Sequence, residues 1–101
     1  MSMNVEVCVG KKLYVSIITE VDKQFNEKTL EVYELNWEEY KKVLEILRKK
    51  YKEHLHKRII FDDNGVPIME LFCFKFYNVD VNIVNEIRKY GKLVPKPKGD
   101  K

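Results

Sequence analysis

The chain has 101 residues, a length that suits one domain with a single core and excludes two. Hydrophobic residues at 45% and charged residues at 35% are typical of a folded, soluble protein and exclude a disordered one. The formal charge of +3, from 19 basic and 16 acidic residues, is too small to indicate nucleic-acid binding by itself. Lysine dominates the basic residues and Gln24 is the single glutamine, a composition found in thermophiles, although an AT-rich genome gives the same lysine bias.

Two further features bear on the compartment. No apolar run approaches the roughly 18 residues of a membrane span, and the amino terminus lacks the pattern of a signal peptide, so we expect a cytoplasmic protein. Cys8 and Cys73 lie in strand-like runs outside any CxxC motif. We interpret them as small buried hydrophobes, and their spacing allows a disulfide without implying one.

The amino-terminal third of the chain predicts three strands. Met3 to Val9 alternates apolar and polar residues, and a second strand follows from Leu13 to Val21. A three-residue loop, Gly10 to Lys12, puts the apolar sets of both strands on one face, whereas a two-residue loop would separate them. Residues 22–28 are polar and predict a loop, and Thr29 to Leu35 predicts a third, shorter strand.

The stretch from Asn36 to His56 has the clearest pattern and predicts a long amphipathic helix. Asn36 is a good N-cap residue, and the carboxylates of Glu38 and Glu39 follow at the positive end of the helix dipole. Apolar residues recur at spacings of three and four and form one stripe that must be buried, namely Trp37, Tyr40, Val43, Leu44, Leu47, Tyr51 and Leu55.

A hairpin follows, with Asp63-Asn64-Gly65 as a type I′ turn between strands at Arg58–Asp63 and Val66–Tyr77. Pairing Asp63 with Val66 predicts that one face packs against the helix stripe, with Ile59, Phe61, Val66, Ile68, Phe72, Phe74 and Phe76. The other face is more apolar than a solvated face usually is, with Ile60, Met69, Leu71, Cys73 and Tyr77, so we expect something to cover part of it.

Asp80 then predicts the N-cap of a short helix, Val81 to Tyr90, with Gly91 as its C-terminal cap. The fold class is therefore α+β, with an antiparallel sheet of about five strands packed on one long and one short helix. The element order is strand, strand, strand, helix, strand, strand, helix. Residues 1–91 form a single compact domain, and residues 92–101, with prolines and a glycine among lysines, form a flexible tail.

Candidate metal ligands are few. His54 and His56 would lie on one face of a strand, but no third ligand is fixed nearby in the sequence, so we interpret them as helix-end histidines. Asp62, Asp63 and Glu70 flank the Asn-Gly turn, but a calcium loop would need aspartate where Ile60 stands. We therefore expect no metal and no other cofactor.

Enzymatic motifs are also missing from the sequence. There is no Gly-rich phosphate loop and no Ser-His-Asp or Cys-His order, so we do not expect an enzyme and infer no small-molecule substrate. The alternate aromatics from Phe72 to Tyr77 compare with strands that stack RNA bases, but Leu71 stands where that motif needs glycine and Lys75 where it needs an aliphatic residue. Core packing is the interpretation we keep for these aromatics.

Two functions from different classes remain open. The first is a small interaction module that binds a second copy or another protein through its partly apolar outer face, Ile60, Met69, Leu71 and Tyr77. The alternative is a nucleic-acid-associated regulator that binds phosphates through the end of the long helix and the tail, with Lys49, Lys50, Lys52, Lys57 and Arg58.

Burial of the helix stripe and of the aromatic face sets an expectation for stability. Trp37→Ala or Phe74→Ala should each cost about 3–5 kcal/mol if both side chains lie in the core. A loss below about 1 kcal/mol at Phe74 would mean that its face is exposed.

Overall fold

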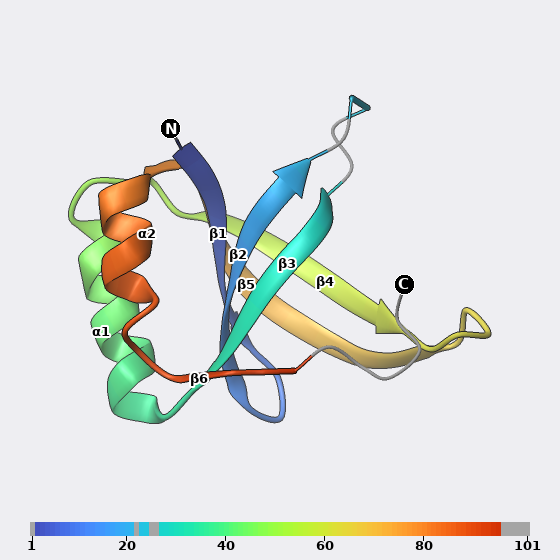
Figure 1. Ribbon diagram of the computed structural model, residues 1–101. Helices are drawn as coiled ribbons and strands as arrows, with labels where there is room; N and C mark the ends of the chain where they lie inside the picture. The colour runs from blue at the N-terminus through green and yellow to red at the C-terminus, as the bar shows by residue number, and fades with distance from the viewer. Residues whose placement is uncertain (1, 22, 25–26, 96–101) are drawn as a thin grey trace.

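The computed structural model describes residues 2–21, 23–24 and 27–95, which form one antiparallel sheet of six strands with two helices (Figure 1). The elements in chain order are β1 (Ser2–Val9), β2 (Leu13–Val21), β3 (Glu27–Leu35), α1 (Trp37–Arg48), β4 (His54–Phe61), β5 (Pro67–Asp80), α2 (Val81–Ile87) and β6 (Lys92–Leu93). In space the strands follow the order β4-β5-β1-β2-β3-β6.

The α+β class is confirmed, and the expected count of five strands is wrong by one. The sixth strand is β6, which pairs Leu93 with Tyr33 at the far edge of β3. It takes up the first two residues of the segment that we predicted to be a tail. Positions 96–101 of that tail, and positions 22, 25 and 26 of the predicted loop, lie outside the described residues.

The first hairpin has the predicted register. Val9 is opposite Leu13, Val7 opposite Val15 and Val5 opposite Ile17, so the loop holds the three residues Gly10 to Lys12. The four innermost of these side chains are fully buried, and they form the floor of the core beneath the two helices. Keeping the apolar sets of both strands on one face therefore decides the register.

Helix α1 begins as predicted but ends eight residues early. The Asn36 side chain accepts from the Glu39 N–H at 2.8 Å, and the Asn36 N–H donates to the Glu39 carboxylate at 2.9 Å. Residues 49–53 hold only one apolar side chain, Tyr51, so another helical turn would bury little. The chain turns there, and residues 54–61, predicted in part as helix, pair with β5 as strand β4.

The early end of α1 changes which residues of its stripe are buried. Tyr40, Val43, Leu44 and Leu47 are buried as predicted. Leu55 lies on β4 and is 85% exposed, and Trp37 is 57% exposed at the first turn of the helix, so both predictions were wrong.

Helix α2 is capped by Asp80, whose side chain accepts from the Asn82 N–H at 2.8 Å, and it ends at Ile87, three residues short of the predicted end. Gly91 has a φ of +78° and leads the chain into β6. A Cβ at this position would lie 2.5 Å from the Glu34 carbonyl oxygen, so only glycine fits. The Gly91 N–H donates to the Glu39 carboxylate at 2.9 Å and so ties the end of α2 to the start of α1.

The second hairpin turns one residue earlier than predicted. Asp62 and Val66 bracket the loop, since the Asp62 N–H donates to the Val66 carbonyl at 2.9 Å, and Gly65 alone within the loop has a positive φ. The Asp62 carboxylate accepts from the N–H groups of Asn64 and Val66, both at 2.9 Å. These bonds stabilise a type I turn followed by a glycine bulge, and the type I′ prediction was therefore wrong.

The two helices cover only one part of the sheet. Figure 1 shows α1 and α2 side by side at one end, while the β4–β5 hairpin extends away from them as an arm. A 12-residue helix is only about 18 Å long, too short to reach along this arm. Of the predicted core face, Phe76 is fully buried and Phe74 half-buried, and the rest is exposed: Ile59, Phe61, Val66, Ile68 and Phe72.

Phe76 and Trp37 were both predicted to lie in the core, but the structure buries only Phe76. Phe76→Ala should lower the free energy of unfolding by about 3–5 kcal/mol, because the ring is fully buried beneath α1 and α2. Trp37→Ala should cost only about 1 kcal/mol, because its ring is mostly exposed and stacks on Tyr40 at the helix surface. Urea denaturation measures both losses, and equal losses would contradict the assigned helix packing.

The Glu39 carboxylate should make stability depend on pH. The N–H groups of Asn36 and then of Gly91 hold the pKa of Glu39 below its ordinary value of 4.5. A lowered pKa stabilises the folded state above about pH 4.5, and this contribution is lost as the pH falls through the folded-state pKa. Glu39→Gln should therefore destabilise the protein near pH 7 and progressively less on acidification. Glu38→Gln, which removes a neighbouring carboxylate that accepts neither bond, is the control, and a loss independent of pH would contradict the assignment.

Candidate functional site

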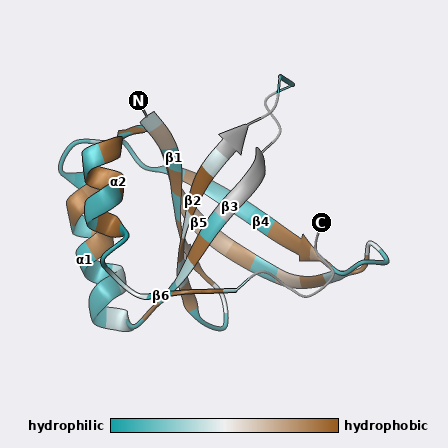
Figure 2. Cartoon of the chain, in the orientation of Figure 1, coloured by the Kyte–Doolittle hydropathy of each residue, from teal (hydrophilic) through white to brown (hydrophobic). Residues whose placement is uncertain are grey.

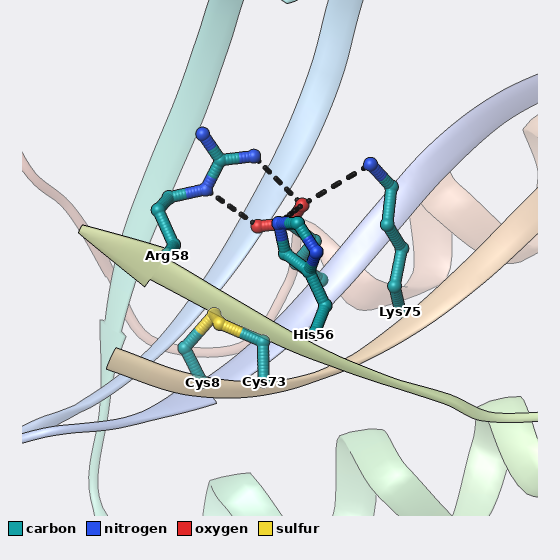
Figure 3. Close-up of a disulfide and its surroundings, with 6 residues drawn as sticks. Cys8, His56, Arg58, Cys73 and Lys75 are labelled. Atoms are coloured by element: carbon teal, nitrogen blue, oxygen red, sulfur yellow. Dashed lines mark hydrogen bonds and ion pairs between the residues drawn. A yellow bond between two sulfur atoms is a disulfide. The ribbon is translucent and has the colours of Figure 1, made fainter. Parts of the chain in front are cut away.

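A buried carboxylate lies on the face of the sheet opposite the helices (Figure 3). Glu6 on β1 is fully buried, and Arg58 on β4 binds it through two hydrogen bonds, from Nε at 2.8 Å and from a terminal nitrogen at 2.7 Å. The Lys75 ammonium on β5 lies 3.4 Å from the same carboxylate, and His56 Nε2 lies 3.6 Å from it. One carboxylate thus joins three adjacent strands, and its pairing offsets the cost of removing the charge from water.

A disulfide lies next to this ion cluster. Cys8 and Cys73 are directly opposite each other on β1 and β5 and are joined in the structure, where both are buried as predicted. Together with Leu71 they form a small apolar cluster on which Tyr14, Ile60 and Met69 pack. The bond closes a sequence separation of 65 residues, a span for which a disulfide typically contributes about 4 kcal/mol.

This packing changes the interaction face that we predicted from the sequence. Leu71 is only 7% exposed, and Ile60 and Met69 are half-buried against it. The cover that we expected on this face comes in part from the chain itself, through Tyr14 of β2. Of the four residues predicted to meet a partner, only Tyr77, at 47%, offers a large exposed side chain.

The predicted basic set is also divided. Lys49, Lys50 and Lys52 lie exposed together where α1 ends. Lys57 lies on the helix side of β4 and pairs with Glu70 at 3.0 Å. Arg58 faces the opposite side and holds Glu6. The structure therefore brings three of the five predicted phosphate-binding residues to one place.

The candidate metal ligands have new neighbours. His54 packs edge-on against Tyr77, with ring centroids 5.1 Å apart, and His56 faces Glu6. The Asp62 carboxylate holds the hairpin turn. Within the described ranges, the ligand atoms of Glu6, Cys8 and Cys73 lie within 4.8 Å of one another, a grouping that local sequence spacing cannot reveal.

The ion cluster was not predicted from the sequence, although two of its residues carry a signal there. Glu6 interrupts a run of valines and Lys75 a run of aromatics, and the two are opposite each other on neighbouring strands. Opposite charges that interrupt two apolar strands indicate a buried pair once the strands are known to be adjacent.

The helix side of the arm carries an exposed apolar surface, which we call the arm face and define as Leu55, Ile59, Phe61 and Phe72. Phe72 is 62% exposed, and it lies on β5 opposite Lys57 of β4. Where the arm meets the helices, the surface continues into an open groove of about 440 Å³ between Val9, Tyr40, Leu55, Phe72 and Phe74. The hydropathy colouring of Figure 2 shows hydrophobic stretches along both strands of the arm.

Comparison with protein-family models, curated proteins and solved structures gave no match to this chain. Among the described helices, none has the length and apolar character needed to cross a membrane.

The buried ion cluster gives a sharp test of stability. Glu6→Gln should lower the free energy of unfolding by about 3–5 kcal/mol, because Arg58 and Lys75 would lose the negative charge that they share. Glu70→Gln is the matched control, since it breaks a half-exposed ion pair on the other side of the same hairpin and should cost at most about 1 kcal/mol. Urea denaturation near neutral pH measures both, and a loss at Glu6 no larger than that at Glu70 would contradict the cluster's role.

Proposed function

We propose that this protein is a small non-enzymatic interaction module and that its arm face binds a second copy of the chain. The observation that carries this proposal is the exposure of large apolar side chains on a regular hairpin, from Leu55 at 85% to Ile59 at 42%. Apolar surface of this kind is stabilised by removal from water, at roughly 25 cal/mol per Å². A second copy that packs on the arm face would bury the apolar side chains that the two helices do not cover.

The position of β4 supports a partner at this edge. β4 ends the strand order, and no strand of the described chain pairs with its outer side. An edge strand presents alternate N–H and C=O groups outward, ready for pairing with another strand. β4 has eight residues, and its apolar side chains lie beside that edge, so a second copy packed on the arm face can also cover the outward backbone groups of β4.

The charges on the arm favour a second copy. Lys57 and Glu70 form an ion pair on the arm face, and Lys57 lies over the Phe72 ring at 5.9 Å from its centroid. A two-fold interface apposes a surface to itself, so each lysine can meet the glutamate of the other copy without like charges being forced together. A partly acidic face is in contrast a poor surface for nucleic-acid phosphates.

The test is the mass in solution by light scattering coupled to size exclusion, at low and high salt, with absorbance at 260 and 280 nm. We expect a salt-resistant dimer without nucleic acid. Phe72→Lys should convert it to a monomer, since a buried lysine without a partner opposes association. Tyr77→Lys is the matched control, because Tyr77 is about half exposed on the opposite side of the same strand, and it should remain dimeric.

Other outcomes identify other functions. A dimer broken by Tyr77→Lys and not by Phe72→Lys would place the interface on the opposite face and contradict the proposal. A monomer carrying nucleic acid that salt removes would favour the phosphate-binding alternative. In that case Lys49→Glu, Lys50→Glu and Lys52→Glu together should abolish binding while the fold stays intact.

A further inference from the structure

We propose that the chain has a second, redox-dependent activity, in which the reduced cysteines Cys8 and Cys73, together with Glu6 and His56, bind a borderline-soft divalent cation of the Zn²⁺ class. This site lies on the face opposite the arm face and does not depend on dimerisation. Two thiolates, one imidazole and one carboxylate are ligands that Zn²⁺ accepts in tetrahedral sites.

The register of the sheet brings these residues together from three strands. His56 on β4 is opposite Cys73 on β5, and Cys73 is opposite Cys8 on β1, so the three form one row across the sheet. Glu6 lies two residues along β1 from Cys8 and points to the same side. The ligands that the sequence did not place near His56 therefore come from two other strands of the sheet.

The distances fit a small cation. The ligand atoms of Glu6, Cys8 and Cys73 lie within 4.8 Å of one another, and His56 Nε2 lies 3.6 Å from Glu6 Oε2. A tetrahedron with bonds of about 2.0 Å to nitrogen and oxygen has an edge of roughly 3.3 Å, close to the His56–Glu6 separation. Breaking the sulfur–sulfur bond lets the two Sγ atoms separate to the distance that a shared cation requires.

The charge of the cluster is the same in both states. A dithiol reductant transfers two electrons and two protons to the disulfide, becomes a disulfide itself, and leaves two thiols. Binding of Zn²⁺ displaces both thiol protons, so the cation and two thiolates together carry no net charge, as the disulfide does. Arg58 and Lys75 consequently keep the same balance with Glu6 in either state. Glu6 Oε2 accepts from a terminal nitrogen of Arg58 and lies 3.4 Å from the Lys75 ammonium, whereas Oε1 accepts from Arg58 Nε and has a second lone pair, so Oε1 can still contribute a ligand atom.

His56 supplies the route of entry. Glu6, Cys8 and Cys73 are buried, whereas the His56 side chain is 38% exposed and borders solvent. A cation can therefore reach the row at its β4 end, and the other three ligands hold it away from water.

The test is a titration of the full chain with Co²⁺, as a spectroscopic substitute for Zn²⁺, after reduction with a dithiol reductant that is then removed without oxygen. We expect one Co²⁺ per chain, with thiolate-to-cobalt charge-transfer absorption that Zn²⁺ abolishes. The oxidised protein and a Cys8→Ser/Cys73→Ser variant should give no such absorption. His56→Ala should weaken binding at least about tenfold, whereas His54→Ala, two residues away on the same strand face, should leave it unchanged.

Circular dichroism recorded in parallel shows whether the reduced chain is folded, so that a missing absorption can be interpreted. If the reduced chain stays folded and shows no thiolate-to-cobalt absorption, the proposal is overturned. If reduction unfolds the chain, Zn²⁺ should restore the native spectrum, and failure to restore it overturns the proposal equally. Equal weakening by His54→Ala and His56→Ala would also contradict the assigned ligand set.

Discussion

The pairing of one buried carboxylate with cations from two neighbouring strands is the interaction on which the rest of this structure depends. Glu6 holds Lys75 on the adjacent strand and reaches Arg58 one strand further, so it helps to fix the edge strand β4 to the sheet. The disulfide beside it fixes β1 to β5 in the same region. The ion cluster and the disulfide both lie on the face of the sheet without helices. They stabilise that face in place of the apolar packing that a second helical layer would supply.

That arrangement holds the arm to the sheet, and the length of the arm explains why apolar surface stays exposed. The helices finish their packing over β1, β2 and the carboxyl end of β5, where Phe76 and Val79 are fully buried. Beyond them the hairpin keeps its strand geometry because its other face is tied to Glu6, and its aromatic side chains are left without cover. Removal of that surface from water is the driving force behind the proposed self-association.

Sequence patterning predicted what depends on local chemistry and failed where tertiary packing decides. Alternation predicted the α+β class and the register of the first hairpin. Helical spacing predicted the buried centre of α1, and residue type predicted the caps at Asn36 and Asp80. The predicted end of α1 was wrong because Tyr51 and Leu55 continue a helical spacing through a polar segment. Pairing with β5 stabilises residues 54–61 more than a further turn of helix would. In the second hairpin, alternation correctly predicted which side chains share a face. It carries no information on how far a helix extends over that face. The Glu6 cluster and the disulfide join residues 50 or more positions apart, which no local pattern can connect.

The most direct measurement is backbone hydrogen exchange of β4 as a function of protein concentration. An arm that pairs with a second copy should show slower exchange at the outward N–H groups of residues 54–61 as the concentration rises, while β1 and β2 in the centre of the sheet remain protected throughout. That result would place the partner on β4. Exchange in β4 that does not change with concentration, in a protein shown to span the monomer and dimer ranges, would contradict association through the arm.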